Sequence, residues 1–412
     1  MSPRDAAGGA ARARDAGAPD ATGGAGVPAL PLAGLRVLDL SRVLAGPYAT
    51  QLLGDLGAEV WKIERPGSGD ETRAWGPPFV GEASAYFLSV NRNKRSAALD
   101  FREPAHRAAL DRAAREADVV VENFLPGALA PFGLDAASLR RERPSLIVCS
   151  ITGYGQDGPY AALPGYDAVL QGFVGLQSVT GEPGGPPLKV GVALVDVLTG
   201  VHAAAAILAA LVGRLRFGSG AHLDVALFEV GVHSLVNVSQ AALSTGKPAR
   251  RHGNAHPHIV PYQTFAASDG LFVLAVGNEA QWGRVCGVLG EAERARDPRW
   301  ATNPDRVLHR AEVVDWLSRR FAAEPRAAWL ERFRGADVPA GPVRDVHEAV
   351  SDPALSARGM VESHTLPGGE HTPLLAIPWL VDGARAPVRR PPPALGQHTA
   401  EFLAAYGAAS GE

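Results

Sequence analysis

The sequence is poor in sulfur-containing residues and in excess charge of either sign. Among its 412 residues are two cysteines and two methionines, and the formal net charge is −3. Cys149 and Cys286 build no disulfide framework and show no metal-ligand spacing, which is typical of a reducing compartment. So small a net charge gives no general attraction to nucleic acids or to anionic membranes. Any polyanionic ligand must therefore be held by a local basic site.

The motifs of several large enzyme classes are also missing. After the first predicted strand, residues 41–46 read Ser-Arg-Val-Leu-Ala-Gly, which is not the three-glycine dinucleotide fingerprint. Walker A, zinc-ligand and Gly-x-Ser-x-Gly patterns do not occur either. We therefore expect no metal and no permanently bound cofactor.

Long apolar runs are scarce. The longest, residues 203–212, is too short and too rich in alanine to span a bilayer. Residues 1–29 have almost no large apolar side chains and no secretory signal, so they predict a disordered tail. Together these features predict a soluble cytoplasmic protein that binds neither membrane nor nucleic acid.

What remains is the composition of an ordinary globular protein, 46% hydrophobic and 20% charged, long enough for two or three domains. Strand-like and helical segments alternate along the first half, which predicts an α/β fold with a Rossmann-like parallel sheet in a large domain. Residues 270–336 predict a smaller α+β domain. The predicted strands are 35–40, 58–64, 118–123 and 146–151, and the first predicted helix is 46–57. The predicted divisions are a tail at 1–29, the large domain at 30–225, a linker and small domain at 226–336, and a return to the large domain at 337–412.

Asp196 lies between an apolar, valine-rich run at 188–195 and an alanine-rich run at 201–215. The first run predicts a buried strand and the second a helix, so Asp196 is expected at their junction. In one interpretation it is an N-cap that accepts hydrogen bonds from the helix. In another it is a nucleophile that attacks a thioester or an anhydride. The two roles are compatible, and the local pattern leaves both open.

Six basic residues fall on connections of the first half that are expected at strand ends. They form either a solvated rim or a joint binding site for phosphates in the crevice above the sheet. These residues are Lys62, Arg65, Arg92, Lys94, Arg95 and Arg102.

Two loop regions offer further polar groups. Glycine-rich loops before Asp196 are either tight turns or places where backbone approaches a ligand, and Asp167, beside Tyr166, is a second carboxylate or a helix cap. A later loop has three histidines, but Pro257 breaks any helix that would present two of them to one metal ion. We favour a loop that faces the substrate.

These residues resemble a known family, the class III (CaiB/BaiF-type) CoA-transferases, which also include α-methylacyl-CoA racemases. The resemblance runs from about residue 31 to the C-terminus and rests on many motifs in the same order. They are PLAGLRVLD at 31–39, AGP at 45–47, LGDLGAEV at 53–60, KIERP at 62–66, NRNKRS at 91–96, VENF at 121–124, GYD at 165–167, Asp196 with its helix, and GP at 341–342.

The resemblance implies that Asp196 is the catalytic aspartate. It would attack an acyl-CoA thioester to form a mixed anhydride, which CoA thiolate would convert to an aspartyl-CoA thioester. Tyr166 and Asp167 would shape the acyl site. Racemases have a histidine where this chain has Tyr166, and a phenol is a poorer base near neutrality, which favours the transferase.

The family also implies where CoA, as part of the substrate, would bind. Two positions depart from it, because relatives often have arginine where this chain has Leu125 and Pro131, so the phosphates must be held differently or more weakly there. The implied CoA-binding residues are Leu44, Ala45, Arg65, Leu99, Arg102, Asn123 and Phe124.

Within the family the chain is most similar to succinyl-CoA-dependent dicarboxylate transferases of the succinate–hydroxymethylglutarate (glutarate) type. A second substrate carboxylate would need a cation, for which Arg73, Arg251 and His256 are candidates. The matching stretches are CSITGYGQ at 149–156, GYDAV at 165–169, HIVPYQ at 258–263 and RPPPALGQHT at 390–399.

The expected function is therefore transfer of CoA from an acyl-CoA donor, with succinyl-CoA favoured, to a free carboxylic acid, with a dicarboxylate favoured. The family implies an interlocked homodimer. Two alternatives are a 2-methylacyl-CoA racemase and a catalytically silent CoA-binding subunit. The presence of Asp196 disfavours the silent subunit.

Overall fold

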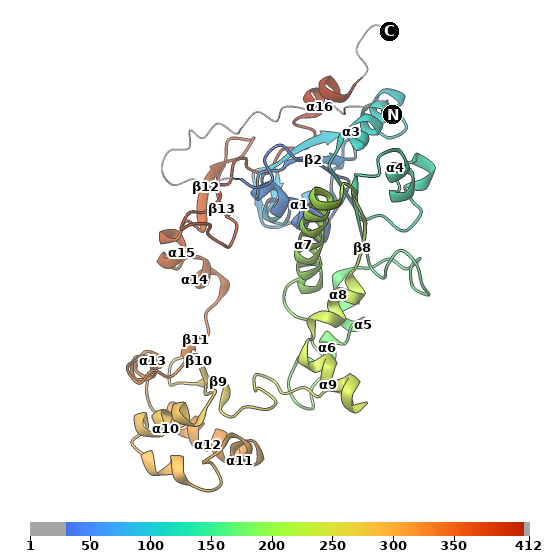
Figure 1. Ribbon diagram of the computed structural model, residues 1–412. Coiled ribbons are helices and arrows are strands. Elements are labelled where there is room, and N and C mark those ends of the chain that lie inside the picture. Colours follow the sequence, from blue (N-terminus) through green and yellow to red (C-terminus); the bar gives the residue numbers. More distant parts are fainter. Residues whose placement is uncertain (1–29, 408–412) are drawn as a thin grey trace, which may run out of the picture.

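The computed structural model describes residues 30–407, which form two bodies of structure joined by extended segments (Figure 1). The upper body holds the large sheet, and the lower body holds a small sheet with helices around it. The tail predicted at residues 1–29 lies outside the described residues.

A six-stranded sheet forms the centre of the larger body, and all neighbouring strands run parallel. This confirms the predicted parallel α/β sheet. The order β5-β2-β1-β6-β7-β8 means that the chain builds first toward one edge and then, from β6, toward the other. The carboxyl ends of β1 and β6 thus meet at a topological switch point, where such sheets leave a crevice for ligands. The strands are β1 (Arg36–Asp39), β2 (Glu59–Glu64), β5 (Lys94–Ala98), β6 (Val119–Glu122), β7 (Ile147–Thr152) and β8 (His222–Ala226).

The inner strands are buried on both faces. Every residue of β6 and β7 is buried, because helices cover each side of the sheet. Val121 and Ile147 belong to the core beneath α1 and α7, whereas Val120 and Val148 belong to the core beneath α3 and α16. The first face carries α1 (Ala45–Asp55), α5 (Asp167–Phe173), α7 (Leu194–Phe217) and α8 (Leu227–Ser234), and the second carries α3 (Pro104–Glu116), α4 (Ala136–Glu142) and α16 (Thr399–Tyr406).

Helix α7 is longer than the sequence predicted, with 24 residues that begin at Leu194. By length and composition it could cross a membrane, which corrects the inference drawn from the shorter run at 203–212. One face of α7, including Ala203 and Ile207, is buried in the core. The helix packs on α1, α8 and β7, so its length alone is weak evidence for a membrane span.

The strand predicted at 188–195 is wrong. The segment pairs with no neighbouring strand, and the Val190 N–H donates instead to the Gln171 side chain at 2.8 Å. Leu188 and Val192 are 50% and 61% exposed. An apolar run forms a buried strand only where a sheet edge is free to pair with it, and β8 already occupies the edge beyond β7.

The smaller body is built on an antiparallel sheet of order β11-β10-β9. Its core is rich in aromatic side chains, with Trp282, Trp300 and Trp316 packed at centroid distances of 5.3–6.4 Å. The mixture of strands and helices is that of the predicted α+β unit, while the residue boundaries given for the domains stay predictions. The elements are β9 (Tyr262–Ala266), β10 (Leu271–Ala275), α10 (Glu279–Val288), α11 (Asn303–Leu308), α12 (Arg310–Phe321), α13 (Arg326–Gly335) and β11 (Ala340–Pro342).

The C-terminal segment then returns to the large sheet (Figure 1). The His398 N–H donates to the Ser96 carbonyl at 2.8 Å, and the Arg389 N–H donates to the Asn93 side chain at 2.8 Å. These contacts cover the edge strand β5. Shorter elements complete the fold: β3 (Phe79–Val80), β4 (Ala83–Ser84), α2 (Ala85–Ser89), α6 (Leu176–Val179), α9 (Asn237–Thr245), α14 (Val346–Val350), α15 (Pro353–Ala357), β12 (Val361–Thr365) and β13 (His371–Leu375).

Candidate active site

Asp196 lies in the first turn of α7, where this helix packs against α5. The N-cap residue of α7 is Ala193, so the interpretation of Asp196 as the N-cap is wrong. Its side chain belongs to a helix start, where the positive end of the helix dipole favours an anion. The residue is half-buried rather than enclosed.

The sequence suggested that Asp167 caps the helix that follows it, which is α5. In the structure Asp167 instead accepts hydrogen bonds from the first turn of α7. It is the first residue of α5, and its Oδ1 accepts from the Val195 N–H at 2.9 Å and the Asp196 N–H at 3.3 Å. Its Oδ2 accepts from the Gln171 side-chain amide at 2.7 Å. Asp167 therefore fixes the start of α7 from the neighbouring helix and brings the two carboxylates together.

The paired arrangement changes the acidity of Asp196. Burial, and then the negative charge of Asp167, raise the pKa of Asp196 from 3.8 to about 7. About half of the molecules then carry an ionised Asp196 at pH 7. A carboxylate that is poorly solvated and costly to ionise is a stronger nucleophile than an ordinary surface aspartate.

Tyr86 on α2 lies near enough to the two carboxylates for their charges to act on its phenol, and the sequence analysis missed it. Burial, then the charges of Asp196 and Asp167, raise the pKa of the Tyr86 phenol to about 12. Its ring packs edge-on against Trp75 at a centroid distance of 5.2 Å. No local signal could have linked Tyr86 to residues about a hundred positions later. At neutral pH its hydroxyl is a proton donor beside the two carboxylates.

Tyr166 precedes Asp167 and is 62% exposed, so its phenol lies at the mouth of this region. The neighbouring loops approach each other very closely. A Cβ added to Gly165 would lie 2.4 Å from the Gly153 Cα. The glycines of the predicted loops are therefore required by backbone packing, and they set the position of Tyr166.

The predicted CoA-binding residues fall into two groups. Leu44 and Ala45 begin α1 after β1, and Asn123 and Phe124 follow β6. Both pairs therefore lie at the switch point of the sheet. Elsewhere, Leu99 is buried, Arg65 is exposed, and Arg102 is an exposed side chain paired with Asp100 at 2.8 Å.

The basic cluster predicted on strand-end loops is largely wrong. Lys94 and Arg95 lie in β5, and Lys62 lies in β2. The Lys62 and Lys94 ammonium groups are fully buried and pair with Asp70 at 2.8 Å and Asp39 at 3.0 Å. A buried cation requires a carboxylate partner, so these lysines stabilise the sheet and do not face a phosphate.

Three further arginines, of which only Arg92 belongs to the predicted cluster, are also engaged. Arg92 donates from Nε to Asp55 at 3.0 Å, within a buried pair. Arg73, a candidate for a second substrate carboxylate, is held by both oxygens of Glu64 at 2.8 Å. Arg251 donates two hydrogen bonds to carbonyls, one to Ser178 in α6 (3.2 Å) and one to Gly185 in the loop between α6 and α7 (2.7 Å).

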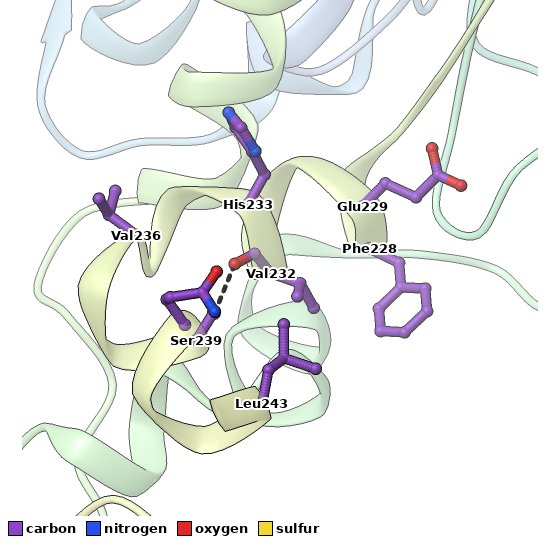
Figure 2. A pocket seen from close by; sticks show the side chains of 8 residues that line it. Phe228, Glu229, Val232, His233, Val236, Ser239 and Leu243 are labelled. Carbon is purple, nitrogen blue, oxygen red and sulfur yellow. Dashed lines mark hydrogen bonds between the residues drawn. The ribbon is translucent and has the colours of Figure 1, made fainter. Parts of the chain in front are cut away.

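A hollow of about 630 Å³ lies between α8 and α9. Figure 2 shows the side chains that line it. Apolar side chains dominate it, and Val236 and Leu243 are 70% and 81% exposed. The Ser239 hydroxyl donates to the Val232 carbonyl at 2.8 Å, so one wall is fixed by the backbone. Asp196 does not line this hollow.

Comparisons with known proteins show the family of the chain. Residues 32–399 match CoA-transferase family III. The chain is 45% identical to the succinate–glutarate CoA-transferase of Agrobacterium fabrum, over 91% of this chain and 95% of that protein. It is 43% identical to the succinyl-CoA:glutarate CoA-transferase of Homo sapiens, over 90% and 85% of the two chains. Among solved structures, a CaiB/BaiF family protein from Brucella suis superposes with a TM-score of 0.82 and 44% identity, covering 92% of this chain and all of that one.

Proposed function

Because the chain belongs to CoA-transferase family III, we propose that it moves CoA from succinyl-CoA to a free dicarboxylate through Asp196. The observation that carries this proposal is the pair of carboxylates at the start of α7, where Asp167 accepts from the backbone N–H of Asp196, and where burial, followed by the charge of Asp167, raises the pKa of Asp196 to about 7. The similar proteins are named as succinate–glutarate or succinyl-CoA:glutarate CoA-transferases, which supports succinyl-CoA as donor and a dicarboxylate such as glutarate as acceptor.

The proposed chemistry has four balanced steps. The Asp196 carboxylate attacks the thioester carbonyl, forms an acyl anhydride and releases CoA thiolate. The thiolate attacks the aspartyl carbonyl, which forms an aspartyl-CoA thioester and frees the donor acid. The acceptor carboxylate then attacks that thioester, giving a new anhydride and CoA thiolate. The thiolate finally attacks the acceptor acyl carbonyl, forming the product acyl-CoA and restoring Asp196.

The groups around Asp196 suit these steps. Each step begins with an anion attacking a carbonyl, so oxyanions develop close to the site and need donors. The Tyr86 hydroxyl, which stays protonated at neutral pH, would supply one such donor. Because every intermediate keeps an activated carbonyl, we propose that no metal and no permanently bound cofactor takes part.

For CoA, we propose the crevice at the switch point between β1 and β6. The adenine and pantetheine would contact Leu44, Ala45, Asn123 and Phe124 along the switch point, with Leu99 farther away at the end of the edge strand β5. The exposed guanidinium groups of Arg65 and Arg102 would meet the phosphates, because the buried lysines of this half are occupied by carboxylates.

For the second carboxylate of the acceptor, we propose Arg251, with His256 beyond it. Arg73 is unsuitable because Glu64 holds it bidentately. Arg251 anchors the loop that leads into α7 and so moves with the acyl site. Arg251→Gln should raise the KM for a dicarboxylate acceptor about tenfold and leave the KM for a monocarboxylate of equal length unchanged. The matched control is Arg250→Gln, since Arg250 is exposed.

We also propose a homodimer. Exposed apolar side chains are concentrated on the outer faces of α7, α8 and α9, with Val212, Leu215 and Val236 each more than half exposed. Such a surface needs a cover. A second copy of this chain would supply it, and sedimentation at several concentrations should then give a dimer mass.

The transfer mechanism is tested by trapping. The protein is mixed with succinyl-CoA, quenched with hydroxylamine, digested and compared by mass spectrometry with Asp196→Ala. We expect a hydroxamate on the peptide that contains Asp196 and none in the variant. A hydroxamate on another peptide, or none with any acyl-CoA tested, would refute Asp196 as the nucleophile.

A further inference from the structure

Two loops meet at the switch point and are joined by one side chain. The Asn123 Oδ1 accepts from the Arg42 N–H at 2.9 Å, and the Asn123 Nδ2 donates to the Arg42 carbonyl at 2.8 Å. Both ends of this amide are therefore bonded to the backbone of a single residue. The bond pair links the loop after β6 to the loop after β1, across the crevice of the sheet.

The loop after β1 is strained where Asn123 holds it. Val43 has φ = 70°, a left-handed conformation that is costly for a β-branched residue. Such a conformation persists only when its surroundings fix it. Asp70 does so, because its two carboxylate oxygens accept from the Val43 N–H at 3.2 and 3.3 Å.

The buried ammonium group of Lys62 holds the Asp70 carboxylate in place. The Lys62 Nζ donates to Asp70 at 2.8 Å and to the Ser41 carbonyl at 2.9 Å, and neither charged side chain is exposed. The backbone of residues 41–43 is thus held at three successive positions by Lys62, Asn123 and Asp70. Leu44 and Ala45 follow directly and begin α1.

On the other side of the crevice, the loop after β6 is anchored as well. The Phe124 N–H donates to the buried Glu122 carboxylate at 2.8 Å. The Asn123 side chain therefore connects the loop after β6, which Glu122 holds at Phe124, with the Arg42 backbone in the loop after β1. Shortening it would release the loop after β1 without disturbing the strands.

From this arrangement we infer that Asn123 and Asp70 are positioning residues of the CoA site, which hold the strained loop 41–44 and so fix the backbone of Leu44 and Ala45 at the start of α1 beside the crevice. This inference rests on the proposed function, and it assigns the Asn123 side chain to the protein backbone. Only the backbone of residue 123 would then contact CoA.

The inference is tested with Asn123→Ala by titration calorimetry of free CoA, by steady-state kinetics and by thermal unfolding. We expect the Kd for CoA to rise about tenfold, the equivalent of one or two lost hydrogen bonds. The KM for the acceptor acid should stay within twofold. The matched control is Asn278→Ala, which removes a side-chain acceptor from the Gln281 N–H at the start of α10 in the smaller body. It should lower the melting temperature and leave the Kd for CoA unchanged.

A second variant covers the event that Asn123→Ala unfolds. Asp70→Asn keeps an oxygen that can accept from Val43 but removes the charge paired with Lys62. It should also weaken CoA binding. Unchanged CoA binding in folded Asn123→Ala, or equal weakening in Asn278→Ala, would overturn the inference. Failure of the unaltered protein to bind CoA would instead overturn the proposed function on which it rests.

Discussion

Replacing Asp196 by asparagine should abolish transfer and, at the same time, stabilise the fold. The pKa of this carboxyl rises from 3.8 to about 7 in the folded protein, so ionising it costs more there than in the unfolded chain. At about 1.36 kcal/mol for each tenfold change in the ionisation constant, the upper limit of that cost is about 4 kcal/mol. Because Asp196 is only half-buried, we expect about 2–4 kcal/mol.

The size of the stabilisation by Asp196→Asn depends on pH. Below pH 3.8 the group is protonated in both states and contributes no difference. As pH rises toward 7, the unfolded chain ionises first and the unaltered protein loses stability, whereas Asp196→Asn does not. The advantage of the variant should therefore grow between about pH 4 and pH 7 and then stay constant.

The assay is urea unfolding of both proteins at pH 5, 6, 7 and 8, followed by far-ultraviolet circular dichroism. Asp118→Asn is the matched control, since Asp118 pairs with Arg214 at 3.2 Å and accepts from the Arg36 N–H at the opposite end of the sheet. That variant should be less stable at every pH. An Asp196→Asn variant that is no more stable at pH 8 than at pH 5, relative to the unaltered protein, would refute the reasoning.

Four further variants have definite expected outcomes. Asp167→Asn removes the like charge and should lower the pKa of Asp196. The acidic limb of the pH profile of kcat/KM should then move to lower pH, which a pH–rate series would show. Gly200→Ala would place a Cβ 2.7 Å from the α1 backbone and should lower the free energy of unfolding by about 1–3 kcal/mol. Gly213→Ala in the same helix would place a Cβ with nothing within 4 Å, and thermal unfolding should show a gain in stability of about 0.5–1 kcal/mol. Lys94→Ala leaves a buried carboxylate without its partner and should cost about 3–5 kcal/mol by urea unfolding; a loss below 1 kcal/mol would contradict the assigned pairing.

Four strands of the parallel sheet, β1, β2, β6 and β7, were predictable because each is a local apolar run, whereas β5 carries Lys94 and Arg95 and was predicted to be a connection. Asp196 and Asp167 were likewise identified from motifs that carry their own context. What sequence could not supply was their mutual geometry: Asp167 caps α7 from another helix, about thirty residues away along the chain. The apolar run before Asp196 was misread as a strand because its composition says nothing about whether a sheet edge is free.

The positions of charged residues in the sequence were the least reliable guide to the structure. Lys62 and Lys94 resemble surface residues in the sequence, and only their tertiary pairing with Asp70 and Asp39 explains why they are buried. Tyr86 was missed for the same reason, since its relation to the acidic pair exists only in three dimensions. Local patterns predict elements and motif residues, but electrostatic partners depend on the fold.

The return of the C-terminal segment to β5 also has a consequence for biosynthesis. Ser96 meets His398, its partner from the end of the chain, across 302 positions of sequence. At about 5–20 residues per second, the ribosome needs roughly 15–60 s to make the intervening chain. Throughout that interval the outer strand of the sheet lacks this cover, so the nascent large domain carries an open edge until the segment around His398 has been made. Chaperone protection during translation should matter more for this chain than for a protein of equal size whose sheet closes early.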